Sequence, residues 1–240
     1  AGGGPLSRGD APKLPNWQLI RSSENLRRNL KLRARLLGGI REFFTERGFL
    51  EIDVPALVPL PGMEPHLHPI PVTIHDRHGR PFAFYLPTSP EYALKKLLAG
   101  GLDRIFSLTH AFRDREVSET HNIEFALLEW YRTGADYFQL MRDCEDLVCE
   151  LAESILGGLR MAYQGKTIDL RPPWPRATVA ELVREHAGVD IRGDTSLEEL
   201  VEIARRKGYS EVSTEWPWED VFYLIFLNEV EPVSYTHLRA

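Results

Sequence analysis

The first apolar residues of the chain recur at the spacing of an amphipathic helix, with Arg and Lys between them. An amphipathic helix is predicted over residues 26–47, ending at Gly48. The apolar residues that recur at helical spacing are Leu26, Leu30, Leu36, Leu37, Ile40, Phe43 and Phe44. Three later segments have helical patterns as well: residues 137–156, 178–187 and 197–207.

Other segments have the composition and length of strands, namely residues 49–54, 82–86, 105–109 and 123–131. The last two flank a polar loop over residues 114–122, which predicts a hairpin. Residues 56–79 are rich in Pro and His, without a clear period. Strands interspersed irregularly with helices predict an α+β fold around an antiparallel sheet rather than a regular βαβ array.

A strand-to-helix turn is predicted after residues 82–86. Ser89 is a suitable N-cap, Pro90 suits the first helical position, and Glu91 falls in the first turn. Gly100-Gly101 would close this helix.

The composition is that of an ordinary globular protein, with 240 residues, 43% of them hydrophobic. A net charge of −6 disfavours non-specific nucleic-acid binding by the whole chain. No apolar run has the roughly 18 residues of a membrane span, and residues 1–16 read as a disordered lead-in rather than a signal peptide. We therefore expect a cytoplasmic protein without a membrane partner.

Two charged or ligating groups have competing interpretations. The basic residues Arg27, Arg28, Lys31, Arg33 and Arg35 could touch nucleic acid, but they fall on the polar side of the first helix and are expected to face solvent. His66 and His68 could suggest a metal site, yet no Cys accompanies them and the segment is rich in Pro. No metal ligand is predicted in this chain.

The hairpin over residues 110–131 gathers most of the candidate chemistry: Arg113, Arg115, Glu116, His121, Asn122, Glu124 and Glu129. Strand alternation places Phe125, Glu129 and Tyr131 on one face, so that a carboxylate and a phenol lie beside an aromatic ring. Arg at a strand end can pair bidentately with phosphate oxygens. The composition favours a nucleotide site, and the alternative is a solvated loop with surface ion pairs.

The hairpin resembles motif 2 of the class II aminoacyl-tRNA synthetases at Phe112-Arg113, Glu116, His121-Asn122, Glu124-Phe125 and Glu129-Trp130-Tyr131-Arg132. Residues 26–55 resemble motif 1, the dimer-forming helix and strand of that class. Together with the Glu129-Trp130-Tyr131-Arg132 ending, Thr88-Ser89-Pro90-Glu91-Tyr92 and Val230-Glu231-Pro232 are similar to the lysyl-tRNA synthetase paralogues that attach β-lysine to elongation factor P. The resemblance extends over residues 17–232 and implies the class II catalytic fold.

The resemblance implies a role for each matching position. Arg113 would contact the α-phosphate of ATP and Phe125 would stack on adenine, with His121 and Asn122 nearby. The adenine amino group would be read by Glu116 or its neighbours Asp114 and Arg115. Glu91 would bind one ammonium group of the substrate, Ser89 and Pro90 would line the same pocket, and Glu129 and Tyr131 would read the second amine of a diamino acid.

The activity implied is ATP-dependent activation of lysine or β-lysine as an acyl adenylate, followed by transfer to a lysine of elongation factor P. Catalysis would come from positioning and from neutralisation of charge by Arg113 and Mg²⁺. A homodimer through motif 1 is expected. An anticodon domain would have no room in residues 1–16, so tRNA is not an expected partner.

The chain departs from the family pattern in three places. Arg115 stands where many relatives have Glu, and Ile123 stands where Pro is usual. Motif 3 and the acidic residues that hold Mg²⁺ are not found, so the catalytic domain is expected to be incomplete at its C-terminus, with the Mg²⁺ ligands beyond the end of this chain. Residues 233–240 resemble no family segment. Two alternatives stay open: a fragment of a lysyl-tRNA synthetase, or a non-catalytic synthetase-like binding or regulatory protein.

Overall fold

The structure is a computed structural model that describes residues 16–118 and 121–232. The chain divides into two compact units, one up to Leu151 and one from Ala152. The expected lead-in lies outside the described residues except for Asn16, and the expected tail over residues 233–240 lies outside them altogether.

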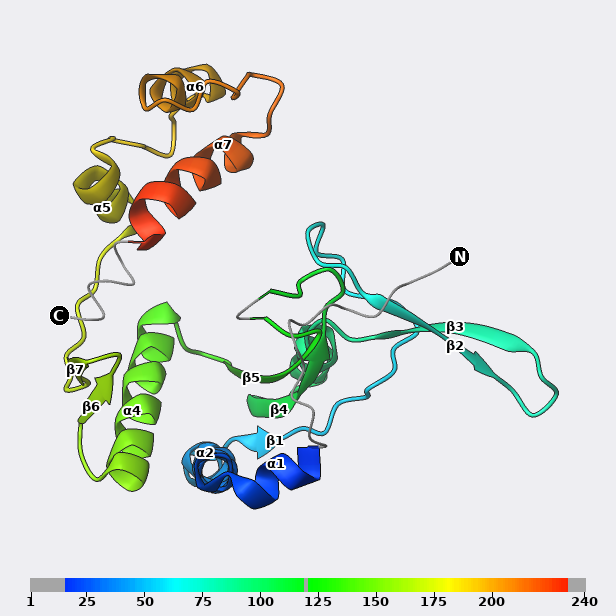
Figure 1. Cartoon of the computed structure of the whole chain (residues 1–240). Helices are drawn as coiled ribbons and strands as arrows, with labels where there is room; N and C mark the ends of the chain where they lie inside the picture. The colour runs from blue at the N-terminus through cyan, green and yellow to red at the C-terminus, as the bar shows by residue number, and fades with distance from the viewer. Residues whose placement is uncertain (1–15, 119–120, 233–240) are drawn as a thin grey trace. The chain divides into compact units, whose positions relative to one another are not determined.

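The first unit is built around a three-stranded sheet in the order β1-β4-β5 (Figure 1). Its elements are α1 (Asn16–Ser22), α2 (Glu24–Glu46), β1 (Leu50–Glu51), β2 (Ile70–His75), β3 (Pro81–Leu86), α3 (Glu91–Ala99), β4 (Arg104–Phe112), β5 (Glu124–Arg132) and the greater part of α4 (Tyr137–Leu156). The expected α+β class is confirmed, and so are the first helix, the hairpin and the helix over residues 137–156.

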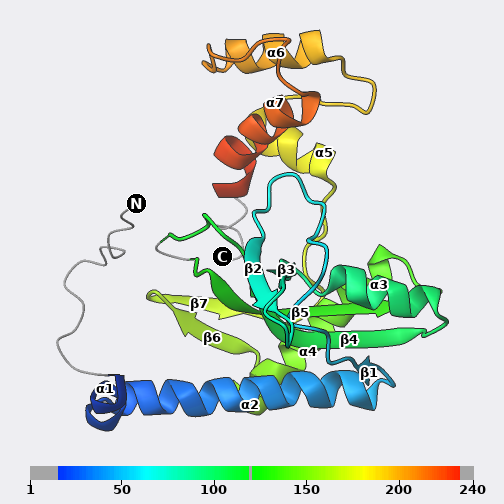
Figure 2. The same cartoon turned by 90° about the vertical axis from the view of Figure 1, so that its right-hand side faces the viewer.

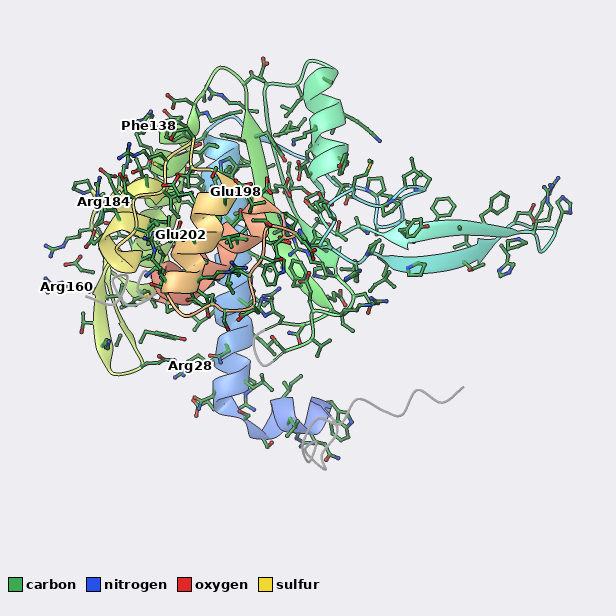
Figure 3. All side chains as sticks on the ribbon, turned by 90° about the horizontal axis from the view of Figure 1, so that it is seen from above. Arg28, Phe138, Arg160, Arg184, Glu198 and Glu202 are labelled. Atoms are coloured by element: carbon green, nitrogen blue, oxygen red, sulfur yellow. The ribbon has the colours of Figure 1, made fainter. Side chains whose placement is uncertain are left out.

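Helix α2 lies along one face of the sheet (Figure 2), where its last turns form an aromatic core. Phe44 is fully buried and stacks on Phe106 of β4 at 4.9 Å between ring centroids. Trp130 of β5 packs against the same cluster. The basic residues of α2 are exposed, and Figure 3 shows Arg28 projecting from the helix, as the helical pattern predicts.

The other face of the sheet is covered by α3, through a smaller cluster of Val54, Leu94 and Ile105. Ile105 pairs with Tyr131 across the hairpin, and Phe106 pairs with Trp130. Since neighbouring residues of a strand point to opposite faces, one face of β5 belongs to the α2 core and the other to the α3 side.

Three predictions for this unit need correction. The strand expected over residues 49–54 is only Leu50–Glu51 and runs parallel to β4; its last hydrogen bond joins the Ile52 N–H to the Phe106 carbonyl at 2.8 Å. The N-cap of α3 is Pro90 rather than Ser89, and the helix begins at Glu91. The segment without a period contains β2, which pairs antiparallel with β3 in a hairpin that extends away from the three-stranded sheet (Figure 1).

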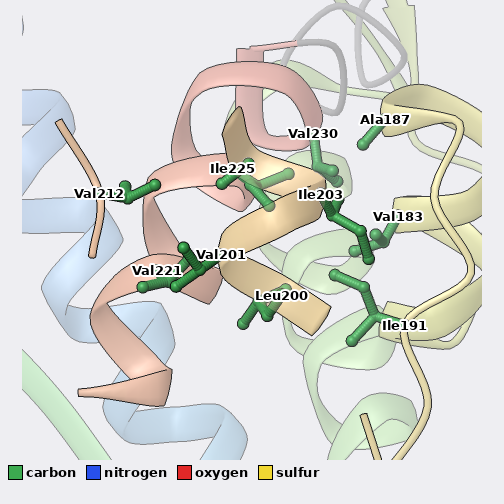
Figure 4. Close-up of a cluster of buried hydrophobic side chains, with 11 residues drawn as sticks. Val183, Ala187, Ile191, Leu200, Val201, Ile203, Val212, Val221, Ile225 and Val230 are labelled. Carbon is green, nitrogen blue, oxygen red and sulfur yellow. The ribbon is translucent and has the colours of Figure 1, made fainter. Parts of the chain in front are cut away.

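The second unit is mainly helical and has its own core, shown in Figure 4. Its elements are the hairpin β6 (Arg160–Tyr163) and β7 (Lys166–Asp169), α5 (Val179–Leu182) continued by the π-helical turn η1 (Val183–Ala187), α6 (Leu197–Arg206), and α7 (Trp218–Ile225) continued by the π-helical turn η2 (Phe226–Val230). The helices expected over residues 178–187 and 197–207 are present. Leu200 of α6 and Val221 and Ile225 of α7 are fully buried in the core of this unit.

Candidate functional site

Glu129 is the centre of a hydrogen-bonded group on the α3 side of the sheet. The Ser89 hydroxyl donates to Glu129 Oε2 at 2.7 Å, and the Tyr131 hydroxyl donates to Glu129 Oε1 at 2.6 Å. Strand alternation brings Glu129 and Tyr131 to one face of β5, as predicted from the sequence. Ser89 reaches them from the loop between β3 and α3, and the structure thus unites three of the five residues expected to bind an amino acid.

Glu91, the first residue of α3, brings a second carboxylate toward this group. Its carboxylate forms an ion pair with Lys95, one helical turn later. A hydrogen bond from Lys95 to Glu91 and the charge of Glu91 raise the pKa of the Lys95 amine, and the charge of Glu129 adds to this. Both carboxylates therefore act on the same region, which is the electrostatic setting that an ammonium group requires.

The Ser89 hydroxyl is fixed by two hydrogen bonds, one that it donates and one that it accepts. Besides donating to Glu129, its Oγ accepts a hydrogen bond from the backbone N–H of Glu91 at 3.1 Å. Ser89 and Pro90 also line a hollow of about 40 Å³, whose other walls include Val54, Thr88 and Tyr92. The turn between β3 and α3 therefore fixes both the hydroxyl and one wall of the hollow.

Tyr131 is expected to remain protonated through the ordinary range of tyrosine titration. Burial raises the pKa of its phenol most, followed by the hydrogen bond to Glu129 and then the charges of Glu129 and Glu91. Because the folded pKa lies above the unfolded value of about 10, the phenol contributes stability that is present below pH ~10 and is lost as the pH rises beyond it.

A titration of phenolate absorbance tests this expectation in a protein with eight tyrosines. Between pH ~9 and ~11, where ordinary tyrosines ionise, the wild type and Tyr131→Phe should gain the same absorbance. In Glu129→Gln the loss of the neighbouring charge lowers the pKa of Tyr131, so extra phenolate should form at lower pH. A smaller absorbance gain in Tyr131→Phe below pH ~11 would contradict the assignment.

Arg113 follows β4 directly and lies beside Phe125 of the paired strand. Its guanidinium carbon is 5.1 Å from the centroid of the Phe125 ring. Its Nε donates to the Thr88 carbonyl at 3.4 Å, and Nη1 is 3.8 Å from a carboxylate oxygen of Glu116. These contacts hold a permanent positive charge against an aromatic ring, an arrangement that can bind a phosphate and a stacked base.

The remaining predicted residues lie in the loop of the β4–β5 hairpin, away from Glu129 along the sequence of β5. Asp114 pairs with His68 through its backbone N–H at 2.8 Å, and Arg115 has a left-handed backbone (φ 63°). The Arg115 side chain is 73% exposed, whereas that of Glu116 is 28% exposed and faces Arg113. Of the three residues expected to read adenine, Glu116 is therefore the one whose carboxylate lies beside the Arg113 guanidinium.

His121 and Asn122 are exposed near the loop end of the hairpin. His121 Nδ1 is 2.9 Å from the Ser118 hydroxyl, and its backbone N–H donates to the same oxygen at 3.1 Å. Glu129 lies several residues further along β5, so these two side chains belong to the Arg113 end of the site and not to the Glu129 end.

Sequence reasoning missed the contributions of Thr88 and Lys95. The spacing of four between Glu91 and Lys95 on a predicted helix was a signal for the ion pair. Thr88 is almost fully buried and offers its carbonyl to Arg113, a contact between distant segments that no local pattern announces.

Among residues 16–118 and 121–232, no group of three or more His, Cys, Asp or Glu could hold a metal ion. The expectation that the ligands of Mg²⁺ lie outside these residues stays a prediction. In the same part of the chain no helix is long and apolar enough to cross a membrane.

Comparison with known proteins places these residues in context. Residues 15–234 match the family model of the tRNA synthetases class II (D, K and N). The chain is 34% identical to a lysine–tRNA ligase of Trichormus variabilis over 86% of its length and 36% of that protein. A lysine–tRNA ligase of Carboxydothermus hydrogenoformans is 34% identical over 86% of the chain and 41% of the relative. A lysine–tRNA ligase of Synechococcus sp. is 38% identical over 78% of the chain and 36% of the relative.

The chain thus spans well under half the length of these curated relatives. The family match nonetheless covers all the described residues, including the strands β4 and β5 and the turn at Ser89. The chain therefore belongs to the class II tRNA synthetase family that comprises the D, K and N enzymes.

Proposed function

We propose that the protein activates lysine or β-lysine with ATP and transfers the acyl group to a lysine of elongation factor P. The observation that carries the amino-acid assignment is the Ser89–Glu129–Tyr131 group, with Glu91 close enough to act on Tyr131 and Lys95. Two carboxylates on one side of the sheet suit a substrate with two amines. The names of the relatives, lysine–tRNA ligases, support the same substrate class.

Arg113 and Phe125 are the proposed ATP side of the site. The substrate carboxylate oxygen attacks the α-phosphorus, the bond to the β-phosphate oxygen breaks, and pyrophosphate leaves. The fixed charge of Arg113 stabilises the negative charge that develops on the phosphoryl oxygens. The acceptor amine then attacks the acyl carbon of the adenylate, releasing AMP and a proton.

A homodimer through motif 1 is part of the proposal. The apolar side chains of α1 and α2 that do not enter the core are exposed: Trp17 by 62%, Leu30 by 47% and Leu36 by 38%. A second copy packing along α2 would remove this apolar surface from water. The protein is proposed to act in the cytoplasm.

A lysine–tRNA ligase is the second candidate, and it is favoured by the identity to enzymes of that name. The elongation factor P assignment rests instead on the resemblance of the Thr88–Tyr92 and Glu129–Arg132 segments. With lysine as the substrate, the two candidates share the same adenylate and differ in the acceptor, which is an amine of elongation factor P in the first and a hydroxyl of tRNA in the second.

Acceptor choice tests the proposal directly. The complete protein, supplied with ATP, Mg²⁺ and either labelled lysine or labelled β-lysine, is expected to label elongation factor P and to leave lysine tRNA unlabelled. Elongation factor P with its acceptor lysine replaced by arginine is the control and should stay unlabelled. Label on tRNA alone would replace the first candidate by the second, and no adenylate with either amino acid would overturn both.

A further inference from the structure

The loop between β1 and β2 carries an acidic residue that the proposed function does not use. This loop is tied to the site at both ends. Val58 exchanges two backbone hydrogen bonds of 2.9 Å with Tyr85 of β3, and the His68 carbonyl accepts from the backbone N–H of Asp114 at 2.8 Å. Gly62 and Glu64 lie in the sequence between these two backbone contacts, which hold this part of the loop beside β3 and the β4–β5 hairpin.

One carboxylate oxygen of Glu64, Oε2, is buried and has no hydrogen-bond partner among the residues that the structure describes. Burying an acceptor without a donor costs free energy, more so when the group is charged. The other carboxylates of the site differ in this respect. Both oxygens of Glu129 accept hydrogen bonds, and Glu91 is paired with Lys95.

Gly62 makes the room for this oxygen. A Cβ atom at Gly62 would lie 2.3 Å from Glu64 Oε2 and 2.9 Å from the Thr88 hydroxyl oxygen. Both oxygens therefore lie against the same glycine. Gly62 and Thr88 also line the hollow of about 40 Å³ next to Ser89 and Pro90, which has space for a single small polar group.

We propose that Glu64 binds an ammonium group of the amino-acid substrate beside Gly62 and Thr88, as a determinant of substrate specificity. This inference rests on the proposed function. The Glu64 oxygen without a donor lies against Gly62, and Gly62 and the Thr88 hydroxyl adjoin the hollow, a combination of acceptors that matches a compact cation with three donors. A divalent cation would need more oxygen ligands than this loop supplies. The remaining walls of the hollow, including Val54, Val58 and Leu60, are apolar and suit methylene groups.

Two variants of the complete protein test the role of Glu64 without removing bulk from the core. Glu64→Gln keeps the shape and removes the charge. Gly62→Ala displaces the carboxylate, since its methyl would occupy the space now taken by Oε2. Each is expected to raise the KM for the amino acid about 10- to 100-fold in ATP–pyrophosphate exchange, with the KM for ATP changed less than about twofold.

Met63→Ala is the matched control, because Met63 lies between the two positions and is 82% exposed. Its kinetics should equal those of the wild type, and all three variants should melt at wild-type temperature. An unchanged amino-acid KM in folded Glu64→Gln, or an increase in the KM for ATP instead, would overturn the proposal while the proposed function stands.

Calorimetric titration with lysine and with norleucine separates the two claims. Norleucine has the same carbon chain but lacks the second amine. If the wild type shows no exchange yet binds lysine, and Glu64→Gln weakens that binding about tenfold or more, the ligase assignment fails and the Glu64 site stands. Equal lysine affinity in the wild type and Glu64→Gln overturns the site.

Discussion

Arg113→Ala in the complete protein is expected to lower the rate of amino-acid-dependent ATP–pyrophosphate exchange by about 10²- to 10³-fold. The guanidinium is held by the Thr88 carbonyl and by Glu116 and lies over Phe125, so its charge is oriented before ATP binds. Such a charge needs no reorganisation when negative charge develops on the phosphoryl group. The loss should therefore appear mainly in kcat.

Arg113→Lys separates charge from geometry. Lysine keeps the positive charge but cannot form two parallel hydrogen bonds, so activity should remain well below that of the wild type. Arg142→Ala is the control, because Arg142 is an exposed arginine of α4 whose guanidinium donates a hydrogen bond to the Gln139 side chain. If Arg113→Ala kept wild-type kcat while folded, the hairpin could not be the ATP side of the site.

Glu91→Ala is expected to reduce kcat/KM for the amino acid by about 100-fold or more, through loss of the carboxylate that pairs with a substrate ammonium group. The effect should be seen in the same exchange assay at saturating ATP. Because Glu91 lies at the first turn of α3, the change also removes a favourable charge from the helix N-terminus, which costs about 0.3–1 kcal/mol of stability.

Lys95→Ala distinguishes these effects. It breaks the same ion pair but leaves the carboxylate in place, so amino-acid binding should persist or become tighter. Equal loss of activity in Glu91→Ala and Lys95→Ala would show that the ion pair matters for structure rather than Glu91 for substrate. Unchanged exchange in Glu91→Ala would remove Glu91 from the site.

Helices with a strong amphipathic period were predictable from the sequence. Residues 26–47 and 137–156 correspond closely to α2 and α4. In α2 only the last turns bury against the sheet, through Ile40, Phe43 and Phe44, whereas Leu30 and Leu36 of the same apolar period are exposed. The hairpin was predictable for a similar reason, since two apolar strands flank one polar loop.

The elements that escaped prediction have weak or misleading local signals. In β2, Pro71 interrupts an otherwise alternating pattern, and it is tolerated because β2 belongs to a two-stranded sheet with open edges. Helix α7 is apolar on several sides, and a short apolar run of this kind does not distinguish a helix from a strand. Helix α1 has only seven residues, too few for a period to show.

The candidate site likewise contains one relation that the sequence predicts and others that it does not. That Glu129 and Tyr131 share a face follows from alternation along β5, and the structure confirms it. The contact of Ser89 with Glu129 joins positions 40 residues apart, and the buried oxygen of Glu64 depends on a loop with no regular structure. Such contacts arise from tertiary folding and leave no periodic trace in the sequence.

The division of β5 into a core face and a site face limits which length changes the chain can accept. Deleting or inserting one residue between Phe125 and Tyr131 would exchange the environments of Glu129 and Trp130, placing a carboxylate among Phe44 and Phe106 and an indole beside Ser89. The same change in the loop over residues 114–122 leaves the alternation intact. Length variation among natural or designed homologues should therefore concentrate in that loop.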